Sequence, residues 1–206
     1  MRKLVALLIC SLAPGALAAT PSEGMPLKVR RGFFTETDIG GFLTLGGDNG
    51  YSNLQTYLQL GVGYQLTIGD GKGLVPLGFH VAIGANAANC FAGLVGNDQR
   101  CAESDNFTLT FLSLTGGYLH QVVERLYIGG KGIVGWTLLD PPPVYSPPTG
   151  TNRTPVSGGL NIGAAASLEY ATNMDHFSVG FDVAFRIVIG PNIMSLGFYP
   201  RVQYTF

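Results

Sequence analysis

The last stretch of the chain reads IMSLGFYPRVQYTF, residues 193–206, and its pattern predicts the fold. Apolar side chains occupy alternate positions, namely Met194, Leu196, Phe198, Val202, Tyr204 and Phe206. The positions between them hold Ser195, Gly197, Tyr199, Arg201, Gln203 and Thr205. Alternation that runs to an aromatic final residue is typical of the closing strand of a bacterial outer-membrane β-barrel, in which lipid-facing and lumen-facing rows alternate. We therefore expect the chain to end as a transmembrane strand.

The other end of the chain has the form of a secretory signal. Arg2 and Lys3 precede an apolar run over residues 4–12, and residues 16–18 have the small-x-small form of a cleavage site. We expect residues 1–18 to be removed on export. A retained anchor helix is the competing interpretation, but the apolar run is well short of the ~20 residues that span a bilayer.

The composition favours strands and excludes several classes of protein. Only 12% of the 206 residues are charged and 30 are glycine, while aromatic and β-branched residues are plentiful. Loss of the signal removes two of the twelve basic residues and none of the thirteen acidic ones, so the mature chain lacks the basic face that nucleic-acid binding needs. No later segment approaches the ~18 consecutive apolar residues of a membrane helix. A membrane-spanning fold would therefore have to be a closed barrel, in which every backbone group is paired.

Alternation with a period of two predicts eight strands in one antiparallel transmembrane β-barrel of the outer-membrane type. The expected strands cover residues 33–45, 53–68, 77–86, 107–119, 126–138, 156–170, 177–189 and 193–206. The fourth alternates least well, because Leu112 and Leu114 share a face with Thr108 and Thr110. We expect residues 19–30 to form a short periplasmic lead and residues 31–206 to form the barrel without an internal domain boundary.

The lengths of the connections support this count. Short, turn-like connections are expected at residues 69–73, 121–125 and 172–175, and longer ones at residues 46–52, 88–106 and 140–155. Short and long connections therefore alternate along the chain, apart from a tight connection at residues 190–192. Outer-membrane barrels have short periplasmic turns and longer outer loops, so both termini are expected on the periplasmic side.

The inward-facing rows carry charged residues that we expect to form one network. The predicted members are the acids Glu36, Asp38, Glu169 and Asp182 and the bases Lys131, Arg186 and Arg201. An eight-stranded barrel is only wide enough for side chains to fill it. Confined charges should pair, because breaking one partner of a buried pair costs ~3–5 kcal/mol. An ion path or a polar binding core is the functional alternative.

His176 and Ser178 stand at alternate positions and raise the alternative of an enzymatic role. Nucleophilic catalysis needs such a pair oriented by a third group. Parity predicts that both residues share the inward face of Asp182 and Arg186, near a periplasmic turn and away from lipid acyl chains. We therefore expect a non-enzymatic protein, and the sequence predicts no cofactor and no metal site.

Two features distinguish the longer outer connections. Cys90 and Cys101 lie in one loop, and the oxidising exported compartment favours a disulfide that would contribute on the order of 3 kcal/mol. Zinc is the rival interpretation, but no His or second cysteine pair lies nearby. A later loop is rich in proline and holds Pro141, Pro142, Pro143, Tyr145, Pro147 and Pro148. Such a segment forms a stiff, extended arm, which would serve either as a protease-resistant loop or as a site for partner docking.

One resemblance extends further than the fold. The runs RGFFTETDIGGF at residues 31–42 and YSNLQTYLQLGVGY at residues 51–64 resemble the adventurous gliding motility protein CglE family of myxobacteria. The resemblance extends over the mature chain and is sharpest in these two strands. It implies a non-enzymatic outer-membrane component of the envelope-spanning gliding machinery, which works at sites of surface adhesion. The partners it implies are other outer-membrane barrels, lipoproteins and periplasmic proteins, beside the outer-membrane lipid itself. The alternative is a general small barrel for adhesion or for passage of a small hydrophobic compound.

Overall fold

The computed structural model describes most of the predicted barrel. It covers residues 31–46, 51–88, 106–140, 144–145, 154–155, 157–190 and 193–206. The predicted signal at residues 1–18 and the predicted lead at residues 19–30 lie outside these ranges, and both stay predictions. Within the described ranges, no helix combines the length and the apolarity needed to cross a membrane.

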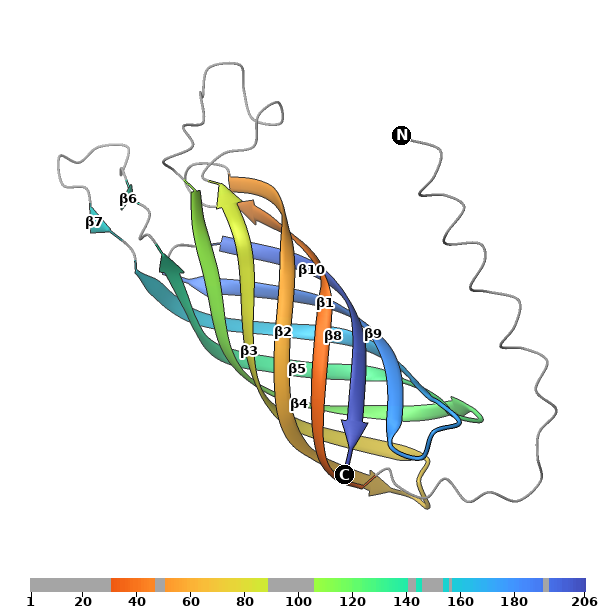
Figure 1. The fold of residues 1–206 in the computed structure, drawn as a ribbon. Helices are drawn as coiled ribbons and strands as arrows, with labels where there is room; N and C mark the ends of the chain where they lie inside the picture. Colours follow the sequence, from red (N-terminus) through yellow and green to blue (C-terminus); the bar gives the residue numbers. More distant parts are fainter. Residues whose placement is uncertain are drawn as a thin grey trace, which may run out of the picture.

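Eight strands close into one antiparallel barrel, which confirms the predicted fold class (Figure 1). They are β1 (Gly32–Gly46), β2 (Tyr51–Ile68), β3 (Gly73–Ala88), β4 (Asn106–Val123), β5 (Leu126–Asp140), β8 (Gly158–Ala171), β9 (Phe177–Ile189) and β10 (Ile193–Thr205). Around the barrel each strand pairs with its neighbours in sequence order, and β10 closes on β1. Register is continuous along this closure, from Phe34 opposite Thr205 to Leu45 opposite Met194.

Several strands are longer than their sequence pattern predicts. β3 begins at Gly73 instead of residue 77, and β4 continues to Val123 instead of residue 119. Their ends pair with each other, with Gly73 opposite His120. Pro76 interrupts the alternation here, although it keeps its place in register opposite Gln65. Backbone pairing therefore continues beyond the point where side-chain alternation could identify it.

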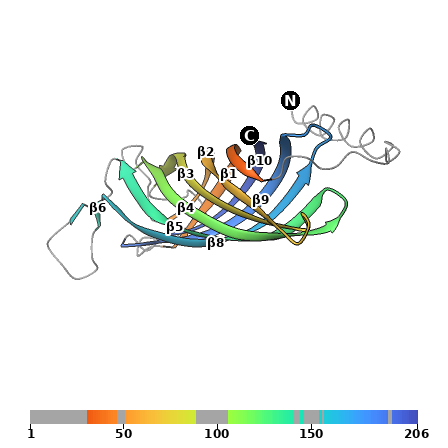
Figure 2. The same cartoon turned by 90° about the horizontal axis from the view of Figure 1, so that it is seen from below.

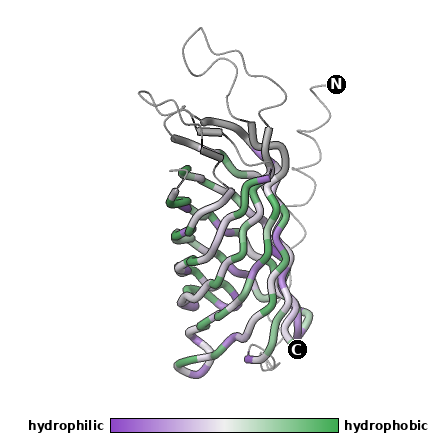
Figure 3. Tube along the Cα trace, turned by 90° about the vertical axis from the view of Figure 1, so that its left-hand side faces the viewer, coloured by the Kyte–Doolittle hydropathy of each residue, from purple (hydrophilic) through white to green (hydrophobic). Residues whose placement is uncertain are grey.

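The outer wall of the barrel is apolar on every strand. Exposed side chains on the eight strands include Ile39, Leu60, Phe79, Leu114, Val134, Leu168, Phe181 and Val202. Figure 3 shows hydrophobic and hydrophilic residues alternating along the strands. This is the reverse of a water-soluble barrel, and hydrocarbon is the surrounding that such a wall fits.

The interior is layered. Buried apolar side chains fill the part nearer the long connections, where the cluster includes Phe42, Leu109, Phe111, Val188 and Ile193. A second cluster, towards the short turns, consists of Leu74, Leu119, Tyr127 and Ala171. The buried charged residues lie between these two apolar layers. Tyr127 also donates a hydrogen bond to the carbonyl oxygen of Gly71 at 3.1 Å, which ties the second layer to a turn.

A short hairpin lies within the proline-rich connection between β5 and β8. It consists of β6 (Val144–Tyr145) and β7 (Thr154–Pro155), which are antiparallel. Both views place β6 beyond the end of the barrel wall (Figures 1 and 2). Sequence reasoning predicted an extended arm and missed this pairing, because two residues are too few to carry an alternation.

Candidate functional site: the charged layer of the barrel interior

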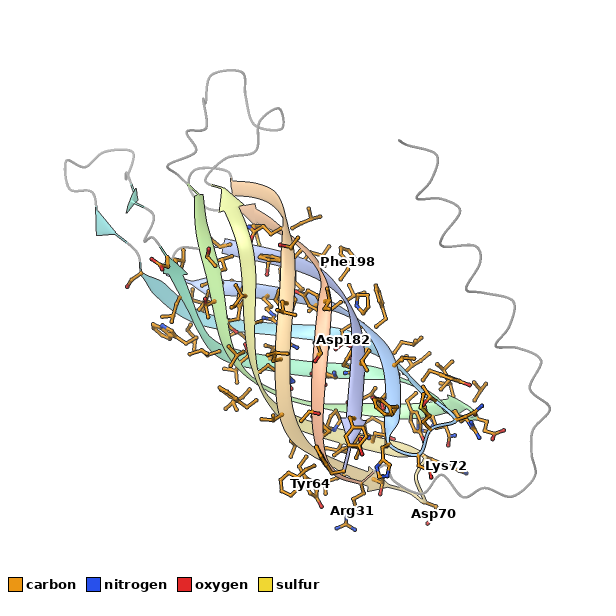
Figure 4. All side chains as sticks on the ribbon, in the orientation of Figure 1. Arg31, Tyr64, Asp70, Lys72, Asp182 and Phe198 are labelled. Atoms are coloured by element: carbon orange, nitrogen blue, oxygen red, sulfur yellow. The ribbon has the colours of Figure 1, made fainter. Side chains whose placement is uncertain are left out.

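The seven charged residues predicted for the lumen all lie buried inside the barrel. Glu36 and Asp38 come from β1, Lys131 from β5, Glu169 from β8, Asp182 and Arg186 from β9, and Arg201 from β10. Figure 4 shows Asp182 midway along the barrel, well above Arg31, Asp70 and Lys72 at the turn end. The register between strands places these side chains at similar depths along the barrel axis, and Asp38, for example, stands directly opposite Arg201.

Arg201 is the centre of the ion pairs. Its guanidinium lies 3.0 Å from Glu169, 3.4 Å from Asp182 and 3.8 Å from Glu36. Lys131 reaches Asp182 as well, with 2.9 Å between Nζ and Oδ2. One guanidinium therefore links carboxylates from three different strands, and Asp182 is shared by both cations.

Glycines at inward positions beside these residues leave room for the ion pairs to form. Gly180 stands between Glu169 and Arg201 in register, and a Cβ atom there would come within 2.9 Å of the Arg201 guanidinium. The Arg201 side chain passes over Gly180 to reach the Glu169 carboxylate. Gly61 has the same place between Glu36 and His80. A spacer without a side chain thus joins charged residues two strands apart.

Arg186 lies in this interior but has neutral partners among the described residues. It donates to the Tyr57 hydroxyl at 2.8 Å and to the Gln59 side-chain oxygen at 3.3 Å. Its guanidinium carbon also lies 5.0 Å from the centre of the Phe111 ring and 6.0 Å from that of Tyr199. Cation–π contacts of this kind stabilise a desolvated cation.

Gln59 connects the two halves of the layer. It accepts hydrogen bonds from Arg186 and from Tyr57, and its amide donates to Asp38. Tyr57 stacks on Tyr199, with 4.1 Å between ring centres. The sequence placed Gln59, Tyr57 and Tyr199 on inward rows, but parity alone could not identify them as partners of a charge.

His80 is a member of the network that sequence reasoning missed. Its Nε2 atom lies 2.6 Å from Glu36, and its Nδ1 atom lies 3.3 Å from the Thr115 hydroxyl. The ring lies against Gly61 and Gly78, where a Cβ atom would approach it closely. The sequence could place His80 on an inward row, but its position beside Glu36, with Gly61 between them, depends on the register between strands.

Thr115, His80 and Glu36 have the residue types of a nucleophile, a base and an orienting acid. Their surroundings do not suit catalysis on a lipid or a peptide. They line an interior cavity of about 20 Å³ together with Lys131 and Asp182. That volume holds about one water molecule. A lipid or a peptide would not fit in that volume.

The predicted pair of His176 and Ser178 is separated. Ser178 is buried inside the barrel. His176 precedes β9 and is partly exposed, with its ring stacked on Tyr204 and its Nδ1 atom 2.6 Å from the carbonyl oxygen of Thr205. Tyr204 belongs to the outward row of β10, so the prediction that His176 shares the inward face is wrong. Strand parity does not extend into the turn.

The other predicted sites cannot be placed in the same way. Cys90 and Cys101 lie outside the described residues, as do Pro141–Pro143, Pro147 and Pro148. The backbone of Tyr145 forms part of β6. In the described part of the chain, no three His, Cys, Asp or Glu side chains are grouped as metal ligands would be.

Comparison with known proteins extends the description of the fold. No family model and no curated protein matches the chain. Among solved structures, Neisserial surface protein A is similar, with a TM-score of 0.57, 12% identity, and coverage of 84% of this chain and 97% of that one. The chain has the fold of an eight-stranded outer-membrane barrel. At this identity the similarity establishes the fold alone.

Two further structures align over similar lengths. Ail, the attachment invasion locus protein of Yersinia pestis, has a TM-score of 0.48 and 13% identity, over 85% of this chain and 99% of that one. The outer membrane enzyme PagL has a TM-score of 0.47 and 11% identity, over 84% of this chain and 99% of that one.

Proposed function

We propose that this protein is a non-enzymatic outer-membrane barrel that anchors an envelope-spanning gliding motility complex at sites of surface adhesion. Its place in the outer membrane is supported by the apolar wall and the closed antiparallel topology. Its place in a motility complex is supported by the resemblance of residues 31–42 and 51–64 to the CglE family.

The observation that carries an anchoring role is the filled interior. Two apolar layers enclose a charged layer that is held by ion pairs and by hydrogen bonds to Tyr57 and Gln59, and the cavity among these residues holds about one water molecule. Such a barrel offers little path for solutes. Its function then depends on surfaces that partners can reach, which are the outer wall and the two ends.

The ends differ in a way that fits this role. Short turns join the strands at one end, whereas β5 and β8 are joined at the other by a connection that includes β6 and β7. The expected partners are other barrels, lipoproteins and periplasmic proteins of the same complex. The proline-rich connection, with Tyr145 at its hairpin, is our candidate for the partner-docking arm.

The test is deletion of the gene in its source bacterium. We expect single-cell gliding to stop, with unchanged membrane permeability and lipid composition, and complementation with the full chain to restore movement. Cross-linking from the long connections should then capture other envelope proteins, and a barrel carrying a shortened residue 141–156 connection should lose those cross-links while still folding.

The opposite result would favour the general small barrel for adhesion or for passage of a small hydrophobic compound. In that case the deletion strain moves normally but changes its sensitivity to detergents or solutes, or its attachment to surfaces. Normal gliding in the deletion strain would therefore overturn the motility proposal without affecting the fold.

A further inference from the structure

The interior cavity of about 20 Å³ lies where two small residues stand side by side on the inner face of the barrel. Ala165 on β8 and Ala184 on β9 are opposite each other in register, and both line the cavity. Ala184 also stands between Asp182 and Arg186 on the inward row of β9, and these two side chains border the same cavity. The two alanines therefore leave a space between charged side chains.

Polar atoms that lack a partner belong to the residues around this space. Among the described residues, no hydrogen-bond partner reaches Oδ1 of Asp182 or the Nε and Nη1 atoms of Arg186. Both side chains are buried, at 5% and 2% exposure. A buried polar group without a hydrogen bond destabilises the fold, because it has lost its contacts with bulk water. The cavity is thus bordered by one residue that can still accept a hydrogen bond and another that can still donate one.

We propose that this cavity is the binding site of one water molecule, which donates a hydrogen bond to Asp182 and accepts one from Arg186. Buried water needs a volume of at least ~10–15 Å³ and ~2–4 polar partners, whereas cavities with an apolar lining stay dry. The volume of about 20 Å³ meets the first condition. Asp182 and Arg186 meet the second, and Thr115 and Glu36 add polar groups to the lining.

The charges around the cavity favour a neutral molecule over an ion. The lining includes two carboxylate side chains, Glu36 and Asp182, and two cationic side chains, Lys131 and Arg186. An anion is attracted by the cations but repelled by the carboxylates, and the reverse holds for a cation. A water molecule bonds favourably to both kinds of group, because it is a donor and an acceptor.

The water molecule connects two sets of bonded residues across the interior. In one set, Nζ of Lys131 lies 2.9 Å from Asp182. In the other, Arg186 donates to the Tyr57 hydroxyl at 2.8 Å and to Gln59 at 3.3 Å. A water-mediated bridge is nearly as favourable in enthalpy as a direct hydrogen bond. The bridge therefore links polar residues of β2, β5 and β9 into one network.

The first test is a crystal structure of the purified, folded mature barrel at a resolution that shows ordered water. We expect one density peak within hydrogen-bond distance of both Asp182 and Arg186. Crystals grown with bromide distinguish water from a halide, because bromide gives an anomalous signal. An empty cavity, or an anomalous peak at this position, would overturn the proposal.

The second test compares Ala165→Thr with Ala165→Val. The two introduced side chains have nearly the same shape and both displace the water, but only threonine supplies a hydroxyl in its place. We expect Ala165→Thr to unfold at a higher guanidinium chloride concentration than Ala165→Val. Ala171 is the matched control, because it is buried in the apolar cluster with Leu74, Leu119 and Tyr127. There the order should reverse, with Ala171→Val more resistant than Ala171→Thr.

The same order at both positions, with valine more resistant than threonine, would mean that the cavity at Ala165 is dry and would overturn the proposal. Heat modifiability on gels verifies that each variant is folded. The crystal structure of the wild type decides the question even where a variant does not fold.

Discussion

Arg201 is the residue on which the interior depends most. It is 2% exposed and lies close to Glu169, Asp182 and Glu36, which come from three other strands. Buried carboxylates need a compensating cation, because their desolvation is otherwise uncompensated. A single side chain thus stabilises the charges of three strands that are not all its neighbours.

We predict that Arg201→Met lowers the free energy of unfolding by ~3–5 kcal/mol, because it leaves the three carboxylates without their shared partner. Unfolding of the barrel in vesicles by increasing concentrations of guanidinium chloride measures this change. Arg125→Met is the matched control, since Arg125 pairs with exposed Glu124 at 3.8 Å and should cost no more than ~1 kcal/mol. Equal effects of the two substitutions would contradict the network.

Gly61→Ala tests the spacer between Glu36 and His80. The added Cβ atom would lie 2.6 Å from Nε2 of His80 and 2.7 Å from Cγ of Glu36, so both side chains must move. We expect a loss of ~1–3 kcal/mol in the free energy of unfolding, as for other overpacked sites. The control is Gly132→Ala on the outer wall, where the nearest atom is 3.7 Å away. Similar stability of both variants would mean that a side chain at position 61 is tolerated between Glu36 and His80.

At this scale the sequence predicted positions better than partners. Strict alternation placed Glu36, Lys131 and Arg201 inside, because each follows the parity of its own strand. The partners of Arg186 and His80 depend on the register between strands, which a single sequence does not determine. The role of the glycine spacers also depends on this register. Gly180 makes room for an ion pair only because it stands beside Arg201.

Among the elements, the strands whose one face is fully apolar were predicted best. β9 and β10 have the bounds expected from alternation to within one residue, because outward apolar and inward polar residues differ along their whole length. The predicted range of β3 is too short, because Pro76 and Gly78 interrupt the alternation of apolar and polar side chains near its start. The turns were placed correctly, but β4 continues to Val123 and narrows the turn before β5.

The depth of an outward residue should decide the cost of a charge on the wall. Val134 lies near the middle of β5, and Val122 lies at the turn end of β4; both are about half exposed. We predict that Val134→Arg lowers the free energy of unfolding in vesicles by ~2–4 kcal/mol and Val122→Arg by ~0–1 kcal/mol. Urea titrations of both variants measure the difference. Equal costs would mean that hydrocarbon does not cover the middle of β5.

For the whole molecule, closure and filling act together. β10 pairs with β1 along ten register positions, so the wall has no free edge. The apolar layers on either side then keep bulk water away from the ion pairs, which strengthens them relative to pairs at a surface. Closure could be predicted from strand parity and connection lengths. The order of the layers could not, because it arises from shear between strands.

We predict from the layered interior that the barrel does not conduct ions. Ions entering from the long connections would meet Phe42, Phe111 and Ile193, and below them a charged layer whose partners are already bonded. We expect no steady conductance steps when the purified barrel is inserted into a planar bilayer, whereas an open porin in the same membrane conducts. Phe42→Ala should leave it silent, because the bonded layer below remains. Stable steps of one size from the wild type would contradict a filled interior and would favour an ion path through the charged layer.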